Sequence, residues 1–163
     1  MKSLQMLVIA SLLIYSSAYA QDPEKPTMAD KRPNAIYVAQ DFFLTLSINY
    51  ERIFPLSEKI GLGLRGGFGN DMGNKSLAAI GEALFVYGRN KYFFEAGIGY
   101  HQPFTYFDEG PDPPMVALMA GYRYESDKGF LFKVYAEFIP DLFPEEGSWG
   151  HLPFIGFAMG YVF

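Results

Sequence analysis

The feature that most constrains this chain is a repeated alternation of apolar and polar side chains in segments of about ten residues. In residues 129–139, GFLFKVYAEFI, one side of an extended strand would carry Phe130 and Phe132, and the other Lys133 and Glu137. Successive side chains of a strand point to opposite faces, so each such segment has one apolar and one mixed face. We predict eight strands, at 34–40, 44–54, 59–69, 77–87, 91–101, 115–124, 129–139 and 153–163.

The length and spacing of these segments indicate how the strands are arranged. A tilted strand needs ~9–11 residues to cross a bilayer, whereas strands of globular proteins average ~5–6. The predicted connections alternate between short turns and longer loops, although the first connection, at 41–43, is also short. The short turns are 55–58, 88–90 and 125–128, and the longer loops are 70–76, 102–114 and 140–152. This alternation is typical of an eight-stranded antiparallel up-and-down transmembrane β-barrel, the all-β fold that we expect.

The two faces of the predicted strands indicate which side points into the barrel. The interior of an eight-stranded barrel is just wide enough for ordinary side chains, so it cannot hold the bulky apolar face. We therefore expect that face to meet lipid, and the polar, glycine-rich face to line a largely plugged lumen. Buried charges are tolerable when they are paired. The predicted lumen charge network consists of Glu51, Arg65, Glu82, Glu95, Arg123, Lys133 and Glu137.

Aromatic residues, which make up 18% of the chain, collect at the predicted strand ends. Tyr and Phe at both rims are typical of the interfacial girdles of transmembrane barrels. The predicted girdle beside the short turns consists of Phe54, Tyr87, Tyr92, Tyr122, Tyr124 and Phe130, with Tyr161 and Phe163 at the C-terminus. Near the other rim we expect Phe68, Tyr100, Phe138 and Phe154.

Residues 1–20 have the features of a cleaved secretory signal peptide. Lys2 precedes an apolar run over residues 4–15, and Ala18-Tyr19-Ala20 forms a small-x-small cleavage site. The alternative, a membrane anchor, is less favoured because the run is short for a span of ~20 residues.

The residues that follow divide into a polar leader and the barrel. Residues 21–33 carry three prolines and few apolar side chains, so we predict a disordered periplasmic leader. Residues 34–163 would form the outer-membrane barrel. The net charge of −5 and the lack of a basic cluster argue against nucleic acid as a partner. The chain has no cysteine, so it has no disulfide and no lipidated cysteine.

Several segments resemble known outer-membrane proteins. The terminal GYVF, with Tyr161 and Phe163, resembles the C-terminal signal of bacterial outer-membrane barrels, whose last aromatic residue is recognised by the barrel-assembly machinery. SINYERIF (47–54), YFFEAGIGY (92–100) and AGYRY (120–124) resemble strands of small uncharacterised outer-membrane barrels of the Bacteroidota. The resemblance, to an OmpA/OmpX-like barrel, implies a bacterial outer-membrane location and contact with lipid and lipopolysaccharide.

We expect a non-enzymatic structural or interaction module, porin-like in fold but with a filled lumen and acidic extracellular loops at 102–114 and 140–152. Neither a cofactor nor a metal ligand set is predicted, although the loop acids could bind divalent cations that bridge lipopolysaccharide. A narrow channel is one alternative, because a shifting salt-bridge network could pass ions. An accessory subunit of a larger outer-membrane complex is another, with a membrane-protein partner docked on a smooth outward patch at Ala79, Gly81 and Ala83.

Two further alternatives concern chemistry and location. A lipid-modifying enzyme, such as one acting on lipid A, would need a Ser–His–acid set, and His101, His151, Ser148 and Glu145 or Glu146 are the candidates. Their spacing does not dictate that geometry, and neither a nucleophile elbow nor metal-ligand spacing is visible, so we predict no catalytic residue. A soluble, lipocalin-like barrel would require the two faces to be reversed.

Overall fold

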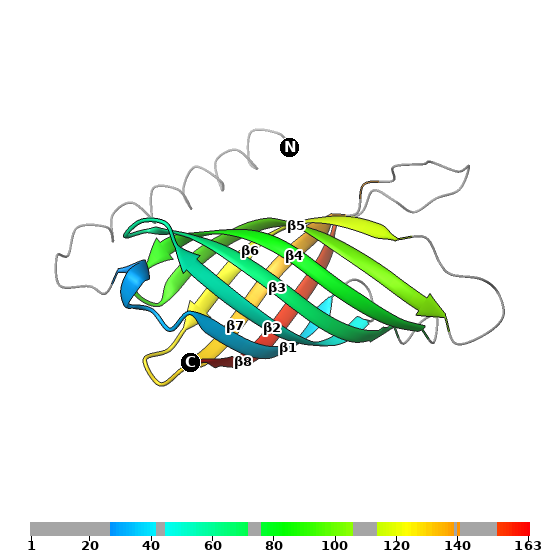
Figure 1. Cartoon of the computed structure of the whole chain (residues 1–163), viewed down its shortest axis with the longest axis horizontal. Helices are drawn as coiled ribbons and strands as arrows, with labels where there is room; N and C mark the ends of the chain where they lie inside the picture. Colours follow the sequence, from blue (N-terminus) through cyan, green and yellow to red (C-terminus); the bar gives the residue numbers. More distant parts are fainter. Residues whose placement is uncertain (1–26, 42–44, 72–75, 106–113, 139, 141–152) are drawn as a thin grey trace, which may run out of the picture.

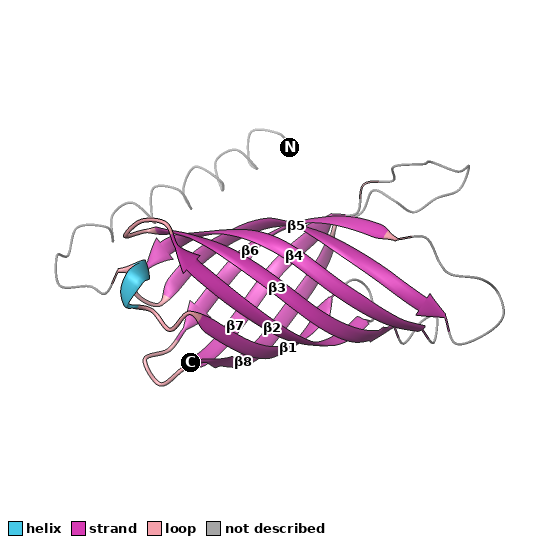
Figure 2. Ribbon diagram, in the orientation of Figure 1, coloured by secondary structure: helices cyan, strands magenta, loops and turns pink. Residues whose placement is uncertain are grey.

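The protein forms one closed antiparallel barrel in the part of the chain that the structure describes (Figure 1, Figure 2). A computed structural model describes residues 27–41, 45–71, 76–105, 114–138, 140 and 153–163. The strands are β1 (Asn34–Asp41), β2 (Thr45–Pro55), β3 (Ile60–Asp71), β4 (Ser76–Arg89), β5 (Tyr92–Thr105), β6 (Met115–Glu125), β7 (Phe130–Phe138) and β8 (Phe154–Val162). Each strand pairs with its sequence neighbours, and β8 pairs with β1. The predicted eight-stranded up-and-down topology is confirmed.

The strand that departs most from its predicted bounds is β5, which continues through Pro103 to Thr105 instead of ending at His101. Sequence analysis placed Pro103 in a loop because proline cannot donate a ladder hydrogen bond. The pairing of β5 with β6 ends at His101 and Met115, whereas its pairing with β4 continues to Thr105. Among the described residues, β5 beyond His101 therefore pairs on one side only, and an edge tolerates proline.

The strands run obliquely around the barrel (Figure 1). Following the registers from strand to strand returns to β1 displaced by about ten residues, the stagger that closure of a tilted sheet requires. Interior side chains at one level of the barrel therefore come from different positions along their strands. None of the described residues forms a helix long and apolar enough to span a bilayer.

Apolar side chains point out of this barrel, and charged side chains point in. Phe68 is 70% exposed and Ile155 is 68% exposed, and all eight strands carry at least one exposed large apolar residue. Arg123 and Glu51, by contrast, are buried. This arrangement is the inverse of that in a water-soluble barrel, whose apolar residues fill the interior.

Outward-facing aromatic rings form a band at each end of the barrel. Beside the short turns, Tyr92 stacks on Tyr122 with ring centroids 6.0 Å apart and contacts Tyr124 at 5.4 Å. In this predicted girdle Phe54, Tyr87, Tyr92, Tyr122, Phe130, Tyr161 and Phe163 are exposed, and Tyr124 is half-buried. At the opposite end Phe68, Tyr100 and Phe138 are exposed, and Phe154 is half-buried.

An apolar layer fills the interior at the short-turn end. Ile53, Phe93, Leu131 and Val162 lie within a few residues of the strand ends, are all buried, and belong to one hydrophobic cluster. Met28, which precedes the barrel, belongs to the same cluster. This end of the barrel is therefore closed by packed apolar side chains.

Residues 27–33, which belong to the segment predicted to be a disordered leader, pack against the short-turn end of the barrel; residues 21–26 lie outside the described part. The backbone N–H of Met28, in the 3-10 turn η1 (Met28–Asp30), donates to the Glu58 carbonyl at 2.8 Å. The Pro33 carbonyl accepts from the Ile53 N–H at 2.7 Å. These bonds and the burial of Met28 depend on the finished barrel, which local composition does not reveal.

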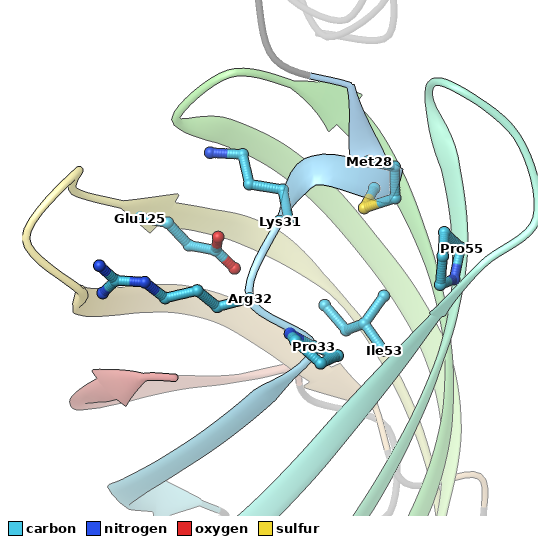
Figure 3. A pocket seen from close by; sticks show the side chains of 7 residues that line it. All are labelled: Met28, Lys31, Arg32, Pro33, Ile53, Pro55 and Glu125. Atoms are coloured by element: carbon cyan, nitrogen blue, oxygen red, sulfur yellow. The ribbon is translucent and has the colours of Figure 1, made fainter.

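Residues of this segment also line a small pocket at the end of the barrel (Figure 3). Met28 and Ile53 form its apolar wall, and Glu125 lies on the opposite side. The segment begins with a local cap, in which the Asp30 carboxylate accepts hydrogen bonds from the Thr27 N–H at 2.9 Å and the Thr27 hydroxyl at 2.7 Å. These two bonds stabilise the carboxylate and hold the pKa of Asp30 below its ordinary value.

Candidate functional site

The first part of the interior is an ion-pair network centred on Arg123. The Arg123 guanidinium contacts Glu51, lies 3.0 Å from Glu95, and donates from Nε to Glu125 at 2.6 Å. The Lys133 ammonium pairs with the same Glu51 and Glu95, at 2.6 Å and 3.0 Å. All five side chains are buried, and they come from β2, β5, β6 and β7. The network therefore ties four strands together across the barrel.

The second part is a network centred on Arg65, nearer the long-loop end. Arg65 pairs with Asp41 at 2.6 Å and with Glu82 at 2.9 Å, and its Nε donates to the Asn49 amide oxygen at 2.8 Å. The Tyr135 hydroxyl donates to the other Asp41 oxygen at 2.6 Å. Each nitrogen of the buried guanidinium thus has an acceptor, which offsets much of the cost of burying the charge.

Tyr37 on β1 connects the two networks. Its hydroxyl donates to Glu51 at 2.9 Å, so it belongs to the Arg123 network. Its ring lies 4.8 Å from the Lys133 ammonium and 5.5 Å from the Arg65 guanidinium, within cation–π range. A single aromatic side chain therefore separates the two groups of charges and contacts both.

Glycines on the inward face make room for these side chains. A Cβ at Gly67 would lie 2.1 Å from the Asn49 amide oxygen, and one at Gly156 would lie 2.2 Å from the Tyr135 ring. Asn49 and Tyr135 are the residues that hold Arg65 and Asp41 in place. The polar network thus occupies the space that the inward-facing glycines leave free.

The structure places all seven residues of the predicted lumen network in the barrel interior, and all seven are buried. It adds two buried carboxylates that sequence analysis missed, Asp41 and Glu125. Both were assigned to connections, although each continues the inward alternation of its strand, Asp41 from Tyr37 and Glu125 from Arg123. Among the described residues, six buried carboxylates therefore face three buried Arg and Lys side chains, which leaves an excess of negative charge.

The third part of the interior is a cluster of three donor side chains, Glu82 on β4, His101 on β5 and Glu137 on β7. One ligand atom from each lies within 4.8 Å of the other two, and all three residues are buried. His101 Nε2 is 3.8 Å from Glu82 Oε1, and neither atom has a hydrogen-bond partner among the described residues. Sequence analysis missed this cluster because its members lie far apart along the chain and follow no ligand spacing.

The other candidate residues fall in two places. His101, one candidate for a rim catalytic set, is buried in the lumen. The other candidates, His151, Ser148, Glu145 and Glu146, lie outside the described residues. Ala79, Gly81 and Ala83 lie on the outward face of β4, and Gly81 has no atom within 4 Å of an added Cβ.

Comparison of the chain with protein-family models, curated proteins and solved structures finds no match. The class that the fold defines is a closed eight-stranded antiparallel β-barrel with a charge-filled interior. This architecture is compatible with the small barrels of the OmpA/OmpX type.

Proposed function

We propose that this protein is an integral outer-membrane β-barrel with a side-chain-filled lumen, and that it acts as a non-enzymatic structural or interaction module. The observation that carries the proposal is the inverted distribution of side chains: large apolar residues are exposed on every strand, while the buried interior holds Arg, Lys, Asp and Glu. An apolar solvent around the barrel favours that distribution, which supports the proposal.

The energetic argument compares water with lipid as the surroundings. A Phe or Leu side chain that stays in water instead of being buried loses about 1.5–3 kcal/mol of hydrophobic stabilisation. Repeated over eight strands, this loss exceeds the ~5–15 kcal/mol of net stability that a domain has. Lipid removes the loss, because an exposed apolar side chain then lies in hydrocarbon. The bands of aromatic rings at the two ends fit the two membrane–water interfaces.

Export and assembly complete the proposal. Residues 1–20 would direct secretion, and the barrel-assembly machinery would recognise Tyr161 and Phe163. Both aromatic side chains are exposed at the C-terminal end of the closing strand β8, and the Phe163 N–H donates to the Asn34 carbonyl at 2.8 Å. Lipid and lipopolysaccharide would then surround the apolar face, and the function would be carried by the connections at the long-loop end.

Spin labels placed singly at Phe94, Phe132 and Phe157 test the orientation of the faces. We expect all three labels to be accessible to lipid-dissolved oxygen and protected from aqueous quenchers, because these positions lie on the outward, apolar face. Electron paramagnetic resonance of the protein reconstituted in vesicles measures both accessibilities. A label at Ser126, in a short turn, is the control and should show the opposite preference. Aqueous accessibility at all three outward sites would contradict the membrane proposal.

Electrical recording tests whether the lumen conducts. We expect the purified protein to produce no defined current steps in planar bilayers, because the lumen is crossed by two ion-pair networks and closed by an apolar layer at the short-turn end. Reproducible unitary steps would favour the narrow channel instead. A known open porin recorded in the same bilayers controls for insertion.

A further inference from the structure

Three donor atoms on three different strands converge in the barrel interior, on the long-loop side of the Arg65 network. From this convergence we propose that Glu82, His101 and Glu137 form a binding site for one divalent transition-metal ion of the zinc class. The site goes beyond the proposed structural role. It depends on the interior geometry alone, so it would exist whether lipid or water surrounds the barrel.

The first support is the state of two buried polar atoms. The side chains of Glu82 and His101 are 1% and 4% exposed, yet Glu82 Oε1 and His101 Nε2 have no hydrogen-bond partner among the described residues. Leaving such atoms without a partner costs ~1–3 kcal/mol each, so buried polar atoms are nearly always bonded. The two atoms lie 3.8 Å apart, close enough for one cation to contact both.

The second support is the spacing of the donor atoms. Three atoms that lie within 4.8 Å of one another leave a central point no more than about 2.8 Å from each. Zinc is bound at ~2.0–2.2 Å by nitrogen and carboxylate oxygen. Each donor atom therefore needs to move by less than about an ångström to reach the ion, which side-chain rotation provides. Backbone movement is not required.

The chemistry of the donors selects the class of ion. An imidazole nitrogen with two carboxylate oxygens suits zinc and neighbouring divalent transition metals, whereas calcium and magnesium prefer oxygen ligands alone. Arg65 binds Glu82 Oε2 at 2.9 Å and leaves Oε1 turned toward the cluster, as an outer partner does for a metal ligand. The excess of buried carboxylates over Arg and Lys among the described residues also favours a divalent cation.

The alternative to a bound ion is a direct hydrogen bond between His101 and Glu82. A protonated His101 paired with Glu82 would form a charge-assisted hydrogen bond of ~2.7–2.9 Å. The observed separation of 3.8 Å is longer than such a bond and leaves room for an ion between the two atoms. The ion would enter from the long-loop end, since the apolar layer closes the other end.

Metal binding to the refolded full-length barrel tests the site directly. After treatment with a chelator, the protein in detergent is titrated with Zn²⁺ by calorimetry, and elemental analysis follows removal of excess metal. We expect one bound Zn²⁺ per chain. We expect His101→Asn and Glu82→Gln each to weaken binding by at least ~10-fold, because each removes a ligand. The matched control His151→Asn, which removes the other histidine of the chain, should bind as the original protein does.

Cobalt provides a second readout, because the visible absorption of bound Co²⁺ reports nitrogen and oxygen ligation. We expect a Co²⁺ spectrum that is lost in His101→Asn and retained in His151→Asn. Heat-dependent gel mobility verifies that each variant is folded, and Glu137→Gln replaces any ligand variant that is not. Failure of the folded protein to bind Zn²⁺, or unchanged binding in folded His101→Asn, would overturn the site. Neither result bears on the orientation of the faces, which the spin labels measure separately.

Discussion

Replacement of Arg123 by methionine is expected to lower the free energy of unfolding by about 3–5 kcal/mol, because it removes the cation paired with buried Glu125 and leaves buried Glu51 and Glu95 with Lys133 alone. Arg123 contacts Glu51, Glu95 and Glu125, and none of the three carboxylates is accessible to solvent to a significant extent. Methionine preserves most of the side-chain volume, so the loss of charge dominates. Urea titration of the refolded barrel in vesicles, followed by intrinsic fluorescence and gel mobility, measures the change.

The matched control removes a cation from an exposed ion pair. Lys91 lies 2.5 Å from Asp127, whose side chain is 73% exposed, so Lys91→Met should cost less than about 1 kcal/mol. Adding Glu125→Gln to Arg123→Met should recover part of the lost stability. Glu125 pairs with Arg123, and the second substitution removes the buried charge that the first leaves unpaired. Equal effects of Arg123→Met and Lys91→Met would show that the interior network does not stabilise the barrel.

Introducing a single methyl group by Gly160→Ala is expected to impair closure of the barrel. Gly160 lies at the seam where β8 pairs with β1, opposite Tyr37. A Cβ at this position would lie 2.1 Å from the Ile36 carbonyl oxygen and 2.3 Å from the Tyr37 Cβ. These atoms belong to the paired strand itself, so relief requires the seam to open or shift. We expect a loss of about 1–3 kcal/mol or more and a lower yield of the compact form on refolding.

Gly81→Ala is the matched control for this substitution. Gly81 lies on the outward face of β4, and no atom lies within 4 Å of an added Cβ. The same methyl group should therefore be tolerated there, with a small gain from the reduced freedom of the unfolded chain. Refolding yield and thermal midpoint, read from heat-dependent gel mobility, compare the two variants. A Gly160→Ala protein that refolds and melts like Gly81→Ala would contradict the close approach of β8 and β1.

The eight strands and the two faces could be predicted from the sequence because they depend on local pattern. A period of two assigns each side chain to one face, and a strand of about ten residues carries enough repeats to make that assignment robust. The inward positions of Glu51, Arg65 and Arg123 follow from the alternation alone. The predicted strand bounds were wrong at strand ends. Asp41, Pro103 and Glu125 were predicted to lie in connections but belong to strands.

The partners of the interior charges depended on the tertiary structure. Arg123 and Glu51 are 72 residues apart, and Lys133 and Glu51 are 82 residues apart. Alternation shows that these residues point inward, but the stagger of the closed barrel decides which of them share a level. The convergence of Glu82 and His101 and the docking of Met28 have the same origin. Local pattern fixes the direction of a side chain, and closure of the sheet fixes its neighbours.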